Sequence, residues 1–176
     1  MSSTAKALQV STPTDTTIVM TRTFNAPRRL VWEAFFVPEK MRKWMTPPPG
    51  WSHSACECDL RVGGALRVVF KNAEADPAMM LYGVFTEVAG QERAIHTETM
   101  VLGSGQPIGS LVEKHEFSER AGSGGSATEM RITQTYASKE ARDGAVESGA
   151  SGGMEACYQV LDVMLAGGKG VDGGTE

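Results

Sequence analysis

Glu113 and His115, two ionisable residues separated by one position, are the side chains of this sequence that best suit chemistry. They lie in a segment with the two-residue period of a β-strand, so both are predicted to share one face. A carboxylate beside an imidazole either moves protons as an acid–base pair or holds a polar group of a ligand by hydrogen bonds. The next predicted strand adds an amide, Gln134, and a phenol, Tyr136. These four residues are our candidates for a polar cluster inside a pocket.

The register of the predicted hairpins between residues 79 and 136 decides which other side chains share this face, because a slip of one residue exchanges the faces of a strand. We expect Phe85 opposite Ile95 and, in the next hairpin, Ile95 opposite Phe117. The last hairpin sets Gln134 opposite Glu113. The shared face is then apolar with a few polar groups, as in a small-molecule pocket. Its predicted ligand-binding residues are Leu81, Phe85, Thr97, Thr99, Glu113, His115, Phe117, Met130, Ile132, Gln134 and Tyr136.

The opposite face carries complementary charges in this register. Glu98 lies beside Lys114. His96 lies beside Glu116, and both pairs suit solvent. We therefore expect His96 to be exposed, and we expect the same of His53. The alternative for the inner face is that its apolar side chains only fill a core, because a sheet under a helix needs such a face with or without a ligand.

A C-terminal helix is the predicted cover of the sheet. Apolar residues recur at positions 154, 157, 160, 161, 164 and 165, which form one stripe at helical spacing. Cys157, Leu161 and Met164 are the helix residues that we expect nearest to a ligand. Four glycines between 144 and 153 predict a break near 149–152, before the helix begins.

The remaining elements follow from hydrophobic period and turn residues. A strand over 17–24 precedes two short helices, which the prolines of 46–50 terminate. Six strands then follow, at roughly 51–60, 65–71, 79–88, 92–102, 110–119 and 127–136. We predict one domain over 17–166, with disordered tails at 1–16 and 167–176.

Composition and charge exclude several classes of function. The 176 residues carry a formal net charge of −4, which disfavours nucleic acid as a partner. No apolar run is long enough for membrane insertion, and the N-terminal segment lacks a signal-peptide pattern, so we expect a cytoplasmic protein. Three cysteines without four-ligand spacing indicate neither disulfides nor a zinc site. We expect no metal and no cofactor.

The chain resembles a known superfamily in several segments. The segments are Arg22-Thr-Phe-Asn-Ala-Pro27, Val31-Trp-Glu-Ala-Phe35, Asp59-Leu-Arg-Val-Gly-Gly64 and Ser138-Lys-Glu-Ala-Arg-Asp143. In this order they resemble the START-like (SRPBCC) superfamily, in the branch related to the activator of heat-shock protein 90 ATPase. The resemblance implies an α+β helix-grip fold, in which a curved antiparallel sheet of about seven strands wraps around a long C-terminal helix. Two short helices follow the first strand of that fold.

Three functions are compatible with the resemblance, because the superfamily contains carriers, enzymes and co-chaperones. The first hypothesis is a domain that binds a small hydrophobic or amphipathic molecule between sheet and helix. The second is an enzyme of the cyclase, dehydratase or isomerase kind, with His115 or Glu113 as acid or base. The third is a chaperone partner. It ranks last, because the eukaryotic activator has a separate N-terminal domain, whereas only residues 1–16 precede the first predicted strand here. Members of the family commonly form dimers, so the resemblance makes a homodimer possible, although no exposed apolar strip in the sequence argues for one.

Overall fold

A computed structural model describes residues 7–103, 105–122 and 124–168, and it confirms the α+β helix-grip fold. Within these described residues, eight antiparallel strands form one sheet, and four helices accompany it. The strands are β1 (Gln9–Thr14), β2 (Thr17–Phe24), β3 (Ser52–Cys58), β4 (Ala65–Lys71), β5 (Met79–Ala89), β6 (Arg93–Leu102), β7 (Gln106–Gly122) and β8 (Gly125–Tyr136). The helices are α1 (Arg28–Phe36), α2 (Pro38–Trp44), α3 (Lys139–Glu147) and α4 (Ala150–Gly168).

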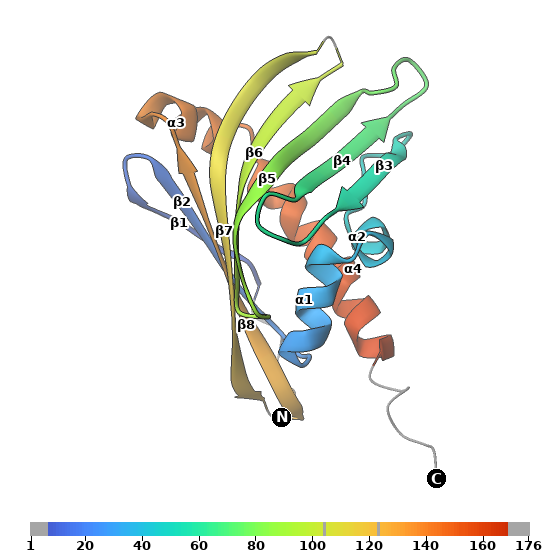
Figure 1. Cartoon of the computed structure of the whole chain (residues 1–176). Coiled ribbons are helices and arrows are strands. Elements are labelled where there is room, and N and C mark those ends of the chain that lie inside the picture. Colours follow the sequence, from blue (N-terminus) through green and yellow to red (C-terminus); the bar gives the residue numbers. More distant parts are fainter. Residues whose placement is uncertain (1–6, 104, 123, 169–176) are drawn as a thin grey trace.

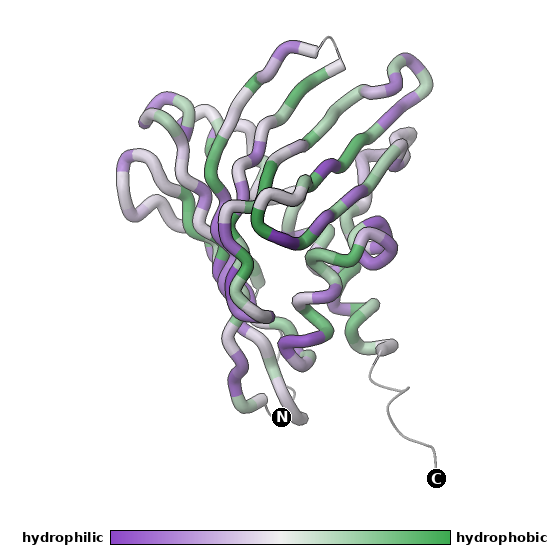
Figure 2. The backbone as a smooth tube through the Cα atoms, in the orientation of Figure 1, coloured by the Kyte–Doolittle hydropathy of each residue, from purple (hydrophilic) through white to green (hydrophobic). Residues whose placement is uncertain are grey.

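The sheet has the order β1-β2-β8-β7-β6-β5-β4-β3, so the β2 strand pairs with the last strand of the chain. It curves, and α4 runs along its concave side with α1 and α2 nearby (Figure 1). Hydrophilic and hydrophobic residues alternate along several strands in Figure 2, as expected for strands with one face against a core. No helix among the described residues combines the length and apolar character needed to cross a bilayer.

The sheet has one strand more than the sequence predicts, because residues 9–14 of the expected disordered tail pair with β2. Every residue of β1 is exposed. The sequence of this segment therefore lacks the alternation of apolar and polar residues that would have predicted an edge strand. At the other end, α4 continues to Gly168, which makes the first two residues of the predicted C-terminal tail helical. The rest of both predicted tails, residues 1–6 and 169–176, lies outside the described residues.

Helix α4 was predicted correctly as the cover of the sheet, but its buried face is rotated. The buried residues are Tyr158, Leu161 and Leu165, spaced by three and four. Val160, which we placed in the stripe, is exposed. Tyr158, which we did not place there, is fully buried and packs edge-on against the ring of Phe24, with 5.6 Å between centroids. Aromatic rings from β2, α1 and α2 therefore surround the middle of the helix.

Arg22 joins this helix to β2. Its guanidinium donates to both carboxylate oxygens of Glu155 at 3.1 Å, and to those of Asp162 at 2.8 and 2.9 Å. The two acids lie seven residues apart, which is two helical turns, so one guanidinium can reach both. The group also lies over the ring of Phe24, 4.8 Å from its centroid. Burial disfavours the charge, but the hydrogen bonds to Asp162 and Glu155 outweigh it and raise the pKa of Arg22.

The predicted break before the helix lies at Ser148 and Gly149, where Gly149 has φ +70°. Gly152, which lies within the predicted break, is helical, and so is Gly153.

Replacing Gly153 by Ala should raise the free energy of unfolding by about 0.5–1 kcal/mol, because Ala loses less backbone entropy in a helix and a Cβ here meets nothing within 4 Å. Gly149→Ala is the matched control and should destabilise by about 1 kcal/mol, because L-residues disfavour its positive φ. Urea denaturation of both variants measures the difference. Equal effects of one sign would contradict this account of the break.

Candidate functional site

A cavity of about 500 Å³ lies between the sheet and the region where α3 meets α4. Strands β1, β2, β6, β7 and β8 supply its walls on one side, and α3 with the first residues of α4 supplies the other. Its apolar lining includes Ile18, Met20, Met100, Leu111 and Met154. The volume and lining are those of a site for a small molecule.

Polar residues line the same cavity on both sides. Glu98, Ser110, Gln134 and Tyr136 belong to the strands, and Glu140, Ser148 and Ser151 belong to the segment that contains α3 and the start of α4. The Tyr136 hydroxyl donates to Oε1 of the Gln134 side chain at 3.0 Å. The side-chain NH₂ group of Gln134 donates in turn to Oε2 of Glu113 at 2.7 Å. Glu113 itself lies behind the cavity wall. Burial, together with the Glu113 carboxylate, raises the pKa of Tyr136 to about 12 and that of Glu98 to about 8. Two hydrogen bonds therefore connect Tyr136 and Gln134 of the cavity wall to Glu113 behind it.

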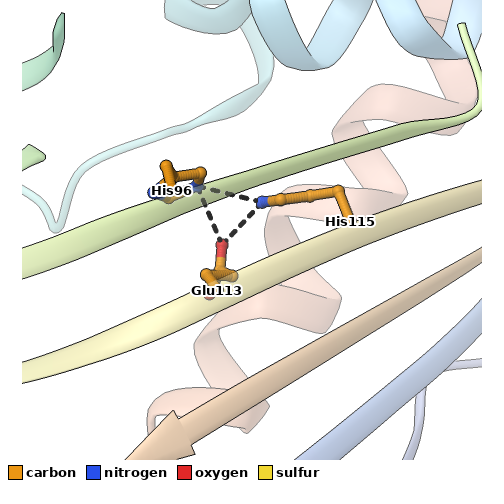
Figure 3. A group of neighbouring side chains, drawn as sticks. All are labelled: His96, Glu113 and His115. Carbon is orange, nitrogen blue, oxygen red and sulfur yellow. Dashed lines mark hydrogen bonds and ion pairs between the residues drawn. The ribbon is translucent and has the colours of Figure 1, made fainter. Parts of the chain in front are cut away.

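Behind Gln134, the side chains of His96, Glu113 and His115 point toward one another (Figure 3). The His115 Nε2 atom lies 2.8 Å from Oε1 of Glu113 and 3.3 Å from Nε2 of His96. The third side of the triangle, from His96 Nε2 to Glu113 Oε1, is 3.7 Å. All three residues are buried. Strand β6 supplies His96, and β7 supplies the other two because residues 113 and 115 share a face.

The charge of this cluster is concentrated on Glu113. Burial opposes its ionisation, but His115, His96 and the Gln134 amide favour the carboxylate and lower its pKa. Burial lowers the pKa of His96 and favours its neutral ring. The carbonyl of Thr97 lies 3.0 Å from Nδ1 of His96. A carbonyl only accepts, so this contact assigns the proton to Nδ1 and a lone pair to Nε2.

Aromatic rings separate the cluster from the opposite end of the core. Phe35 and Phe36 of α1 meet the His115 ring at centroid distances of 5.8 and 5.5 Å. The Phe85 ring lies 5.4 Å from the ring of His96. This surrounding lowers the local dielectric and strengthens each polar contact inside it.

The predicted register of β6 against β7 is wrong. Thr97 lies opposite Val112 rather than His115, a shift of three residues along β7. An odd shift exchanges the faces of a strand, so His96 turns inward and is 1% exposed. Glu98 turns to the cavity with it.

Thr97 and Thr99, predicted as cavity residues, lie on the outer side. The Thr97 hydroxyl accepts from the backbone of Val84, and the Thr99 hydroxyl bonds to that of Ser110. The outer face does not carry the charge pairs that we expected of His96 and Glu98. Exposed apolar residues lie there instead, namely Tyr82, Val84 and Val112.

The β5–β6 register is also wrong, by one residue, whereas that of β7 and β8 agrees with the prediction. Phe85 lies opposite His96, where we expected Ile95. In the last hairpin, Glu113 pairs with Gln134 as expected. The sequence therefore predicted the contact between these two side chains.

The other predicted residues divide between cavity wall and core. Gln134 and Tyr136 line the cavity. The strand residues Phe85, Phe117, Met130 and Ile132 are buried in the core, and Leu81 packs against it half-buried. The helix residues Cys157, Leu161 and Met164 lie outside the cavity lining, because the cavity meets α4 only in its first turns.

Sequence reasoning missed Glu98 and His96. The one signal for them was the sequence of β6 itself. Its even-numbered and its odd-numbered residues form the two faces of the strand, and both sets contain apolar residues. Ala94 and Met100 share a face with Glu98 and His96. Ile95 and Val101 lie on the other face, which is equally suited by its sequence to point inward. The pattern of β6 alone does not choose between the two faces, and the prediction took the wrong one.

The comparisons with known proteins agree with the fold. A family described as Activator of Hsp90 ATPase homolog 1-like protein matches residues 25–166. A solved structure from Rhodobacter sphaeroides is 28% identical, with a TM-score of 0.78, over 91% of this chain and 99% of that one. One from Nitrosomonas europaea is 26% identical, with a TM-score of 0.70, over 90% and 99%.

A third solved structure, from Mycobacterium smegmatis, is 22% identical with a TM-score of 0.74 over 91% of this chain and 97% of that one. At that identity the likeness concerns the fold alone. No curated protein matches the chain.

Proposed function

The chain belongs to the Activator of Hsp90 ATPase homolog 1-like family, and from this premise we propose that it binds a small, mostly apolar molecule in the cavity between the sheet and helices α3 and α4. The observation that carries the proposal is the cavity itself. Its 500 Å³ are lined mainly by apolar side chains, and the hydrogen-bonded pair of Gln134 and Tyr136 lies on its sheet wall. Such a site favours a molecule with a hydrophobic body and one polar end.

Magnitudes support an amphipathic ligand over a pure hydrocarbon. Burying roughly 300 Å² of apolar ligand surface contributes about 7 kcal/mol. The loss of translational and rotational freedom costs about 4 kcal/mol or more, which leaves only millimolar affinity. A hydrogen bond to the Gln134–Tyr136 pair would add about 0.5–1.5 kcal/mol, or roughly 2- to 13-fold in affinity.

The acid–base pair of the enzyme hypothesis is less well placed than a ligand anchor. Glu113 and His115 lie behind the cavity lining, and the Gln134 amide stands between the cavity and Glu113. A general base must lie within hydrogen-bond reach of the proton that it removes. Binding is therefore the function that the cavity supports better.

Native mass spectrometry of the purified chain is the first test, because a cavity ligand that binds more tightly than the millimolar affinity expected of a small hydrocarbon should co-purify as an added mass. The second test is fluorescence titration with naphthalene and 2-naphthol, which differ by one hydroxyl. We expect both to bind, and 2-naphthol to bind more tightly by several-fold. The substitution Gln134→Leu should abolish that preference while it spares naphthalene, since it removes a polar group and keeps an apolar wall.

Two variants serve as controls. Ala145→Phe places a ring in the cavity from α3 and should weaken both probes. Thr97→Val changes the outer face of the sheet and should affect neither. Binding that survives Ala145→Phe, or the absence of any probe or co-purifying molecule in a folded protein, would overturn the proposal.

A further inference from the structure

Three donor atoms of His96, Glu113 and His115 converge in the core, close to the cavity but separate from its lining (Figure 3). We propose that these residues form a binding site for a divalent transition-metal ion, with Zn²⁺ as the probe. The proposal goes beyond ligand binding in the cavity and does not depend on it. The converging atoms are two imidazole nitrogens and one carboxylate oxygen, all within 4.8 Å of one another.

The donor set selects the class of ion. Imidazole nitrogen suits Zn²⁺, Fe²⁺, Co²⁺ and Ni²⁺, whereas Mg²⁺ and Ca²⁺ prefer oxygen ligands only. Two histidines with one carboxylate form the protein ligands of many zinc and iron sites, where a fourth position remains for water or a ligand atom. The cysteines are not part of this set. Cys56 and Cys58 lie on β3, at the far edge of the sheet.

The distances fit one ion between the three atoms. Two ligands held about 2.05 Å from a tetrahedral Zn²⁺ lie about 3.3 Å apart. The two Nε2 atoms are 3.3 Å apart, and Glu113 Oε1 is 3.7 Å from one and 2.8 Å from the other. The 2.8 Å distance must lengthen by about half an ångström and the 3.7 Å distance must shorten by about 0.4 Å. One small movement of the Glu113 carboxylate, away from His115 and toward His96, provides both changes.

The orientation of His96 is that of a metal ligand. Its Nδ1 donates to the Thr97 carbonyl, which directs the Nε2 lone pair at the other two donor atoms. Metal-bound histidines usually have such a partner on the second nitrogen. Glu113 is oriented likewise, since its Oε2 accepts from Gln134 and leaves Oε1 for the cluster.

Hydrogen bonding alone satisfies this cluster poorly. One proton on His115 Nε2 faces two acceptors, the Glu113 carboxylate and the His96 lone pair. Metal binding would satisfy all three at once. It would also require the proton of His115 on Nδ1, which is buried and has no hydrogen-bond partner among the described residues. Metal binding must therefore compensate the free-energy cost of one buried N–H group without an acceptor. The free energy of three coordinate bonds to a divalent ion exceeds that cost.

Removal of metal with a chelator, followed by calorimetric titration with Zn²⁺, tests the proposal on the intact chain. We expect one ion per chain and a higher melting temperature with Zn²⁺. Titration with Co²⁺ should give the visible ligand-field bands of a four- or five-coordinate ion, without the sulfur-to-cobalt charge-transfer band that cysteine ligands produce. Glu113→Gln and His115→Gln should each weaken Zn²⁺ at least about 100-fold, since even residues behind the ligands account for 10- to 100-fold.

The chain offers a matched control in its third histidine. His53 bonds to the Met45 carbonyl and packs against the Phe70 ring at a tilt, away from the cluster, so His53→Gln should bind Zn²⁺ as the wild type does. Circular dichroism without metal shows whether each variant folds. If the cluster variants do not fold, the Co²⁺ spectrum of the wild type decides whether the ion is held by nitrogen and oxygen ligands, as proposed. No stoichiometric Zn²⁺ binding, a sulfur-to-cobalt band, or Zn²⁺ affinity unchanged in folded Glu113→Gln would each overturn the proposal.

Discussion

Replacing Arg22 by Met should lower the free energy of unfolding by about 3 kcal/mol, which is the cost of removing one partner from a buried ion pair. The guanidinium is almost completely buried, and four of its hydrogen bonds reach the two acids of α4. Without Arg22, Glu155 and Asp162 would face an apolar side chain in a partly buried place. Urea denaturation at neutral pH measures the loss.

Two further variants separate the ion pair from general packing. Arg131→Met changes an exposed arginine on β8 and should alter stability by no more than about 0.5 kcal/mol. In a Glu155→Gln, Asp162→Asn background, Arg22→Met should cost clearly less than in the wild type, because no carboxylate is then left without a partner. Equal losses for Arg22→Met and Arg131→Met would contradict this role of Arg22.

The same contact predicts a pH dependence. The hydrogen bond from Arg22 lowers the pKa of Glu155 below its ordinary value of 4.5, against the opposing effect of burial. A carboxyl with a lowered pKa in the folded state contributes stability above its ordinary pKa and loses it as the pH falls through the folded value. The difference in stability between wild type and Arg22→Met should therefore shrink on acidification below 4.5. A difference that stays constant would contradict the linkage.

Replacing Gly83 by Ala should destabilise the protein by about 3 kcal/mol, at the upper end of the range for overpacking. A Cβ at this position would lie 1.6 Å from the carbonyl oxygen of Thr97 and 2.6 Å from its carbonyl carbon. Both atoms belong to the backbone of β6, so no side-chain rotation relieves the clash. The two strands would have to separate beside the pair of Phe85 and His96.

Gly109 provides the matched control for Gly83. It lies in β7 opposite Met100, and a Cβ there meets nothing within 4 Å. Gly109→Ala should therefore change stability by no more than about 0.5 kcal/mol. Urea denaturation of both variants tests the difference, and a Gly83→Ala protein as stable as Gly109→Ala would mean that β5 and β6 are not in this close contact.

The fold could be predicted from local patterns. The strands after Pro49 were found within a few residues of their bounds, because each shows alternation between turn residues. The C-terminal helix was found because its apolar residues recur at helical spacing. Strand β1 could not be found this way. Its residues are all exposed, and it exists because its backbone pairs with β2.

The candidate site was predicted only where a short turn determines the register. Strands β7 and β8 pair as far as Gly122 and Gly125, so few residues separate them and the contact between Glu113 and Gln134 followed from the sequence. Between β6 and β7 the glycine-rich segment permitted several closures. The actual one pairs Leu102 with Gln106 and contains an irregularity between Met100 and Val101.

The sequence by itself thus determined the elements other than β1, their order and the polar cluster of Glu113, His115, Gln134 and Tyr136. Tertiary structure alone decided that His96 joins the cluster and that Glu98 faces the cavity. The physical reason is the two-residue period of a strand, under which a shift by an odd number of residues exchanges its faces. The residues of β6 suit either face, so only its pairing with β5 and β7 selects one.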